Sequence, residues 1–228
     1  MATTNGELGF ASIPDAIESF AAGDFLLVLD SPHRENEGDL IIAAQDLTPA
    51  KCAFLIRHTS GYLCAPLTPA LAARLELPQM VSANADPNRT AYTITVDASE
   101  GVTTGISARD RSHTCRLLAS EGVGRDAFRR PGHVVPLQAR EGGVRVRQGH
   151  TEAAVDLCRL AGKREVGVIA ELVEAGEDVE GVAETRAGEG MMRRDACLAF
   201  GRRWGVKTIT IEDLVKYLEG GGKGKGKG

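Results

Sequence analysis

Three carboxylates stand at alternate positions in the stretch RENEGDL, residues 34–40, directly after the apolar run FLLVLD. In an extended backbone, side chains at every second position point the same way, so Glu35, Glu37 and Asp39 are predicted to share one face. Like charges on one face repel each other unless a cation lies among them. Such oxygen ligands suit Mg²⁺, which fills its other positions with water and substrate oxygens. The alternative is a solvated acidic hairpin, which the apolar sequence on both sides disfavours.

A second polar cluster lies in RVRQGHTEAAVDL, residues 145–157. We expect a strand that ends at Arg147, a glycine turn, and a helix that begins near His150. The free N–H groups and the positive dipole end of a helix start form an anion site, and Arg147 offers a planar fork to phosphate. His150 lies in the same turn, where it can ligate a metal ion. The alternative is an ordinary helix cap that contains a polar histidine.

Three further candidates stand on apolar or turn segments. Glu171 lies in VGVIAELV, where a buried carboxylate without a cation has a raised pKa that suits proton transfer; otherwise Glu171 ends a strand and faces water. His133 follows Pro-Gly, so it is either a turn residue or a catalyst. Cys64 lies in an apolar stretch, where it either packs or reacts.

Hydroxyl groups are concentrated in TTGISARDRSHT, residues 103–114. The residues of this motif that could bind sugar hydroxyls or phosphate are Thr103, Thr104, Ser107, Asp110 and Thr114. A helix capped by Ser107 explains most of these residues without a ligand.

The elements that must position these residues follow from capping residues and periodicity. Helices are predicted after the caps Ser12, Thr48, Thr68 and Ser107, around residues 154–161, and over residues 189–205 and 211–219. Strands are predicted over residues 25–30, 91–97, 133–139, 143–147 and 166–173, with an extended segment near residues 61–67. The sequence has no internal repeat and no GxGxxG loop. This irregular interleaving predicts an α+β fold, with a mixed β-sheet core and surrounding helices in a single domain.

Length and composition limit the classes of protein to consider. The 228 residues suit one domain over residues 12–219, with a flexible segment 1–11 and a disordered glycine and lysine tail, 220–228. The 27 basic and 31 acidic residues give a net charge of -4, so no global basic field is available for nucleic acid. The sequence has no long apolar run and no signal-peptide pattern, which predicts a cytoplasmic protein without a membrane segment. Five cysteines without a CxxC pair are expected to be free thiols.

Five linked motifs resemble those of the 3,4-dihydroxy-2-butanone 4-phosphate synthases, a family of riboflavin biosynthesis. They are RENEGDL, TTGISARDRSHT, RPGHVVPL, RQGHTEAAVDL and VIAEL, in the order and spacing of that family. The resemblance implies a carbon–carbon lyase that converts D-ribulose 5-phosphate to L-3,4-dihydroxy-2-butanone 4-phosphate and formate. It also implies Mg²⁺, with Mn²⁺ as a substitute, no organic cofactor, and a homodimer with active sites near the subunit interface.

The roles of individual residues are likewise implied by the resemblance. The implied metal ligands are Glu35 and His150, and Mg²⁺ held there would stabilise an enediolate. The implied substrate-binding residues are Arg34, Glu35, Asp39, Thr104, Asp110, Thr114, Arg147, Gly149, Thr151 and Glu171. The implied catalytic residues are His133 and Glu171 as proton-transfer groups, with Glu37, Asp39 and Cys64.

The chain departs from the family pattern in two places. Ser31, Pro32 and His33 precede the first motif, where many relatives are acidic, and Arg109 stands where a small residue is usual. Some relatives fuse this domain to a GTP cyclohydrolase II, and at 228 residues the chain is expected to be the stand-alone form. Two other functions stay open. Another Mg²⁺-dependent sugar-phosphate isomerase or lyase would release no formate, and a sugar-phosphate binding protein would not consume ribulose 5-phosphate.

Overall fold

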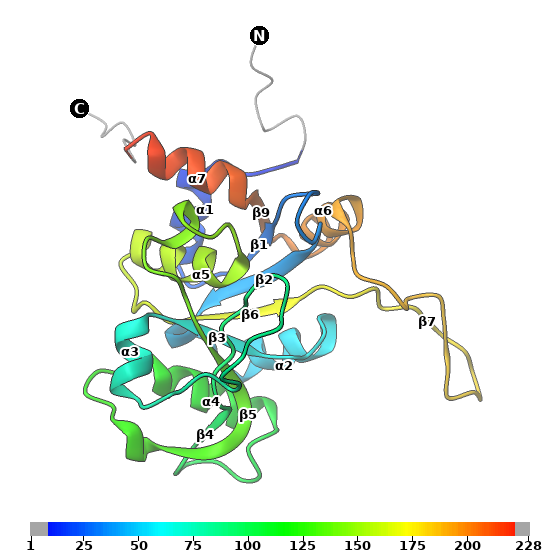
Figure 1. The fold of residues 1–228 in the computed structure, drawn as a ribbon. Helices are drawn as coiled ribbons and strands as arrows, with labels where there is room; N and C mark the ends of the chain where they lie inside the picture. Colours follow the sequence, from blue (N-terminus) through cyan, green and yellow to red (C-terminus); the bar gives the residue numbers. More distant parts are fainter. Residues whose placement is uncertain (1–8, 222–228) are drawn as a thin grey trace.

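One mixed sheet runs through the molecule (Figure 1). The computed structural model describes residues 9–221, and within them seven strands form this sheet in the order β4-β5-β3-β6-β2-β1-β9. The strands are β1 (Leu26–Leu29), β2 (Gly38–Ala43), β3 (Cys64–Leu67), β4 (Val96–Ala98), β5 (Phe128–Gln138), β6 (Gly167–Glu171) and β9 (Lys207–Thr210), with a separate pair β7 (Glu177–Asp178) and β8 (Thr185–Arg186). The pairs β1–β9 and β3–β5 are parallel and the other neighbours are antiparallel. The predicted α+β fold with a mixed sheet is therefore confirmed.

Helices cover both faces of the sheet. One face is covered by α1, α5 and α7, which lie together in Figure 1, and the other by α2, α3, α4 and α6. The helices are α1 (Ile13–Ala21), α2 (Pro49–His58), α3 (Pro69–Arg74), α4 (Ala108–Leu118), α5 (His150–Leu160), α6 (Arg194–Trp204) and α7 (Ile211–Glu219). The predicted caps are confirmed, because Ser12, Thr48, Thr68 and Ser107 each accept a hydrogen bond from the backbone N–H three residues on.

The strands bury alternate side chains in two separate cores. On β2, Leu40 and Ile42 join the core that includes α2 and α4, while Ile41 and Ala43 join the core beneath α1, α5 and α7. Because the side-chain period of a strand is two, Asp39 lies on the same face as Ile41. The central strand β2 thus presents a carboxylate to the layer that contains α5.

The prediction of a strand over residues 143–147 is wrong. The segment Gly143–Arg145 is instead a single 3-10 turn, η4. Gly142 and Gly143 have φ values of 90° and 64°, in the left-handed region that strands do not use. Asp156 of α5 also accepts a hydrogen bond from the backbone N–H of Val144 at 2.8 Å. These contacts compete with strand pairing, so Arg147 does not end a strand.

The predicted strand over residues 91–97 is regular only at its end, where β4 spans Val96–Ala98. Thr93 donates its backbone N–H to the carbonyl of Pro136 at 3.0 Å, and Tyr92 and Leu137 form an isolated bridge. Proline has no N–H to donate in return, which limits the ladder at this point.

In the C-terminal third of the chain, the structure differs from the predicted elements in two ways. The helix expected over residues 189–205 begins only at Arg194, and β9 was not predicted. β9 pairs with β1 in parallel, with Lys207 opposite Leu26, and this long-range contact has no local signature in a segment of four residues.

The expected flexible ends, 1–11 and 220–228, fall mostly outside the described residues 9–221. Within the described part, Phe10 is buried, and Ala11 donates its N–H to the carbonyl of Thr208 at 2.8 Å. Among residues 9–221, none of the helices combines the length and the apolar content needed to cross a bilayer.

The position of Ile41 generates a stability prediction. Ile41 is fully buried between the sheet and α5, so the Ile41→Ala variant is expected to lose about 2–5 kcal/mol of unfolding free energy. Ile106 is 52% exposed, and Ile106→Ala is the matched control, expected to change stability by no more than about 0.5 kcal/mol. Urea denaturation followed by circular dichroism measures both. Equal losses in the two variants would contradict the described core.

Candidate active site

Asp30, at the end of β1, shapes the loop that carries the first motif. Its Oδ1 accepts a hydrogen bond from the backbone N–H of Glu37 at 2.9 Å, and its Oδ2 accepts one from that of Glu35 at 3.1 Å. Asn36 has a φ of 55°, so the chain turns here and becomes extended only at Gly38. The prediction that three carboxylates share one face of an extended segment is therefore wrong, because only the last of them lies in a strand.

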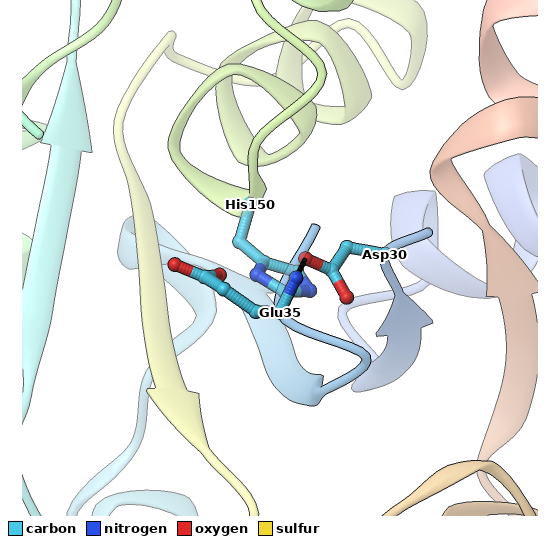
Figure 2. A group of neighbouring side chains, drawn as sticks. All are labelled: Asp30, Glu35 and His150. Carbon is cyan, nitrogen blue, oxygen red and sulfur yellow. Dashed lines mark hydrogen bonds between the residues drawn. The ribbon is translucent and has the colours of Figure 1, made fainter. Parts of the chain in front are cut away.

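The loop nevertheless brings Glu35 to His150, which lies far along the chain. Figure 2 shows Asp30, Glu35 and His150 converging from the end of β1, the following loop and the start of α5, and each has a ligand atom within 4.8 Å of the others. The Nε2 of His150 lies 3.0 Å from the carbonyl oxygen of Val28. This contact places the ring proton on Nε2 and leaves the Nδ1 lone pair available to a metal ion.

The charge state of His150 suits this role. Burial lowers the pKa of its imidazole to about 4, although the nearby Asp30 carboxylate acts in the opposite direction. The ring is therefore neutral at neutral pH, which is the form that binds metal ions.

Asp39 supplies an independent test of whether a cation fits here. Its Oδ1 lies 3.5 Å from the Nδ1 of His150, is buried, and has no hydrogen-bond donor among the described residues. Burial, with the neighbouring Glu171 and Glu35, raises the pKa of Asp39 well above its usual range. Two lone pairs that face each other in a buried site need a proton or a cation close by. The residues present therefore fit a divalent metal ion.

Polar contacts hold the carboxylate of Glu35 in place. Its Oε1 accepts a hydrogen bond from the amide of Asn88 at 2.6 Å, and its Oε2 contacts the guanidinium of Arg34. Burial raises the pKa of Glu35, an effect that Arg34 opposes. Glu37 lies 3.6 Å from the guanidinium of Arg193, which also donates to the carbonyl of Glu35 at 2.7 Å. Arg34 within the loop and Arg193 from a distant segment thus offset part of the negative charge of the loop.

The second motif holds its arginine against the start of α5. Arg147 donates through Nη1 to Glu152 at 2.6 Å and through Nη2 to Thr90 at 3.0 Å, and its Nε donates to the carbonyl of Asn88 at 3.2 Å. Gly149 is the N-cap, and a Cβ there would lie 2.3 Å from Nη1 of Arg147. No side chain caps α5, and Thr151 is buried in its first turn. This arrangement fits an anion at the helix start.

Further candidate residues lie on neighbouring strands at the same face of the sheet. Glu171 stands opposite Asp39 in the β2–β6 pair and accepts a hydrogen bond from Ser60 at 2.9 Å. Cys64 stands opposite Ile169, two residues before Glu171. Burial, with Glu171 and Asp39, raises the pKa of the Cys64 thiol well above its usual range, so it is protonated at neutral pH. A catalytic role for Cys64 stays a prediction.

A second polar cluster surrounds His133 on β5. The Nδ1 of His133 lies 2.7 Å from Oδ2 of Asp97. Asp110 and Thr114 are buried, and both have partners within the chain: Asp110 accepts from Thr103 at 2.7 Å, and Thr114 accepts from the backbone of Ala98 at 3.0 Å. Thr104 is exposed, and no partner of its side chain is described within residues 9–221. Substrate binding by these residues stays a prediction.

Sequence reasoning missed five polar residues of the two clusters. They are Asp30, Asn88, Thr90, Asp97 and Arg193. Asp30 carried a signal, since it is the single charged residue at the end of FLLVLD. Asn88 and Thr90 lie in the polar loop DPNRT, whose composition is that of any surface loop.

Known proteins resemble this chain over most of its length. The family model described as 3,4-dihydroxy-2-butanone 4-phosphate synthase matches residues 14–217. The chain is 58% identical over 211 residues to the protein of that name from Pyricularia oryzae, covering 92% of this chain and 90% of that protein. It is 52% identical over 212 residues to the protein of that name from Schizosaccharomyces pombe, covering 92% and 98% respectively.

A solved structure is also similar. It is described as 3,4-dihydroxy-2-butanone 4-phosphate synthase in complex with two magnesium ions, and it superposes with a TM-score of 0.91 at 57% identity, over 92% of this chain and 98% of that chain. The two curated relatives and the solved structure each match 92% of the chain. The chain therefore belongs to the 3,4-dihydroxy-2-butanone 4-phosphate synthase family.

Proposed function

We propose that this chain is a cytoplasmic, Mg²⁺-dependent lyase that converts D-ribulose 5-phosphate to L-3,4-dihydroxy-2-butanone 4-phosphate and formate. The observation that carries the proposal is the convergence of Glu35 and His150, from segments more than a hundred residues apart, with an unpaired buried oxygen of Asp39 3.5 Å from Nδ1 of His150. Family membership supports the choice of reaction, and a relative that binds magnesium supports the choice of ion. Mn²⁺, which accepts the same oxygen and imidazole ligands, is expected to substitute.

The reaction needs no redox partner. The five-carbon sugar phosphate contains all the atoms of the four-carbon phosphate and of formate, so the chemistry consists of proton transfers, loss and return of water, and a carbon shift. We infer that a base removes the C3 proton, that the C1 hydroxyl leaves, and that the original C4 is expelled as formate after the skeleton rearranges. Bound Mg²⁺ held by Glu35 and His150 would supply stabilisation of the negative charge on the adjacent sugar oxygens.

The positions of the other residues suggest which of them would transfer protons and which would bind the phosphate group. Glu171 and Asp39 are adjacent across β6 and β2, at the face where the metal ligands lie, which suits proton transfer next to the carbonyl. Arg147, with the start of α5 at Thr151, would hold the phosphate group. Binding energy at the phosphate then positions carbons that lie several ångströms away.

Release of formate tests the reaction directly. Ribulose 5-phosphate labelled with ¹³C at C4 is incubated with the chain and Mg²⁺, and the expected product is labelled formate in the ¹³C spectrum. A parallel sample with EDTA is expected to yield none. An isomerase or a binding protein would leave the label in the sugar, and that result would reject the proposal.

The proposed metal ligands can be tested separately. Glu35→Gln and His150→Gln are each expected to lower kcat by at least about 1,000-fold, because polarisation by a metal ion contributes several kcal/mol and each ~1.4 kcal/mol is a factor of ten. Calorimetric titration with Mg²⁺ should show binding lost in both variants, with the far-UV spectrum unchanged. Glu189→Gln, at an exposed position, is the control. Normal Mg²⁺ binding by either variant would show that the substituted residue is not a metal ligand.

We also propose that the chain acts as a homodimer in which His133 serves the active site of the other subunit. The strand order places β5 three strand spacings from β2, so His133 and Asp39 lie roughly 14 Å apart along the sheet. In a symmetric dimer each contact occurs twice, so a second His133 at one Glu35–His150 pair implies the same contact at the other pair.

Sedimentation and mixed variants test this arrangement. The wild-type chain is expected to sediment at twice its monomer mass. Glu35→Gln and His133→Ala are each expected to be inactive alone, while co-expression should restore about a quarter of wild-type activity, because half of the dimers are mixed and one of their two sites is intact. A monomer, or a dimer without complementation, contradicts the shared site.

A further inference from the structure

Arg193 lies where the chain returns to the body of the molecule from the hairpin of β7 and β8, which extends outward in Figure 1. Met192 donates its N–H to the carbonyl of Leu172 at 3.0 Å, and Leu172 donates its own N–H to the carbonyl of Gly38 at 2.8 Å. These main-chain hydrogen bonds fix Arg193 beside the start of β2. Arg193 is the N-cap of α6, but its side chain makes no capping hydrogen bond, so its guanidinium is available to a neighbouring segment.

The start of α6 lies close to the start of β2. A Cβ on Gly38 would lie 2.9 Å from Sγ of Cys197, so a larger residue at position 38 would collide with α6. Cys197 is fully buried and stands one helical turn after Arg193. The packing of α6 against Gly38 therefore places Arg193 next to residues 31–37, which we call the acidic loop.

Two peptide groups of the acidic loop are held from both sides. The Nη1 of Arg193 donates to the carbonyl of Glu35 at 2.7 Å and to that of Asn36 at 3.1 Å. The N–H groups of the same two peptide units also have partners: that of Asn36 donates to a carbonyl earlier in the loop at 3.2 Å, and that of Glu37 donates to Asp30 at 2.9 Å. Because the C=O and N–H of a trans peptide point in opposite directions, these contacts fix both peptide planes.

The shape that these contacts maintain is unfavourable for the free loop. The two peptide planes flank Asn36, whose φ of 55° is an uncommon conformation for a residue with a side chain. The carboxylates of Asp30 and Glu35 have oxygen atoms within 4.8 Å of each other, and like charges at this separation repel. The guanidinium of Arg193 also lies 3.6 Å from the carboxylate of Glu37. Arg193 thus both fixes the backbone of the loop and offsets part of its charge.

We propose that Arg193 is a positioning residue for Glu35: it holds the acidic loop in the metal-binding shape before the cation arrives. The proposal rests on the proposed function for the assignment of Glu35 as a metal ligand. When the loop is already ordered, less of the free energy of cation binding is needed to order it. Glu35 is held directly once a cation is bound, so the effect of Arg193 is largest in the metal-free chain.

Hydrogen exchange of the loop amides tests the ordering without any reaction. The backbone N–H groups of Glu35, Asn36 and Glu37 are followed by NMR in the metal-free wild type and in the metal-free Arg193→Met variant. Exchange at these positions is expected to be at least about tenfold faster in the variant, because the loop loses two hydrogen bonds from a charged donor. Saturating Mg²⁺ is expected to slow exchange in the variant again. Equal rates in the two metal-free chains would overturn the proposal.

Calorimetric titration with Mg²⁺ separates ordering from simple electrostatics. Removal of a positive charge near the site would by itself strengthen Mg²⁺ binding. Arg193→Met is nevertheless expected to bind Mg²⁺ about tenfold more weakly, and Arg193→Lys, which keeps a charged donor, is expected to lose less. Arg202→Met, at an exposed position on α6, is the control and is expected to bind Mg²⁺ as the wild type does. Unchanged or tighter binding by Arg193→Met would reject the proposal.

Activity distinguishes positioning from a direct role in the reaction. At saturating Mg²⁺ the kcat of Arg193→Met is expected to stay within about twofold of the wild type, whereas the Mg²⁺ concentration needed for half of that rate rises about tenfold. The side chain of Arg193 is 53% exposed, so an unchanged far-UV spectrum is expected. A large loss of kcat that saturating Mg²⁺ does not restore would contradict a role in loop ordering alone.

Failure of the proposed function gives a different result. A wild-type chain that releases no formate contradicts the reaction, and hydrogen exchange in the two metal-free chains still decides whether Arg193 orders the acidic loop.

Discussion

The burial of Asp39 among other carboxylates is the constraint on which the site depends. Asp39 is 2% exposed, stands opposite Glu171, and keeps one oxygen without a donor in the described part of the chain. Such a group is costly in a sheet unless something positive shares the site. The start of α5, the neutral ring of His150 and the loop around Asp30 all converge on this point. The carboxylates therefore define where positive charge has to be bound.

The sheet and α5 hold Asp39 and His150 in fixed positions. β2 lies inside the sheet between β1 and β6, so its register is set on both sides. α5 packs on β2, β3 and β6, and its first turn reaches the strand ends through the contact between His150 and the carbonyl of Val28. His150 lies at the start of a helix, whereas Glu35 lies in a loop that Asp30 holds through backbone hydrogen bonds.

Local sequence signals predicted much of the fold but only part of the site. The helices with a capping residue were found, since a cap such as Ser107 acts over three residues. The pairing of β9 with β1 and the 3-10 turn at Gly143 depend on partners far away in the sequence, which periodicity does not reveal. The motifs led to Glu35 and His150, and the structure brings both together. Asn88 and Asp97 were missed because their partners come from other segments.

One loop residue, Asn88, contacts both predicted ends of the substrate site. Its amide donates to Glu35, while its backbone carbonyl accepts from Arg147. A group bound at either end would therefore act on the same short segment. Linkage then requires reciprocity: whatever the cation does to the affinity for the phosphate group, the phosphate group does to the affinity for the cation. Coupling between a cation at Glu35 and a phosphate group at Arg147 would then pass through Asn88.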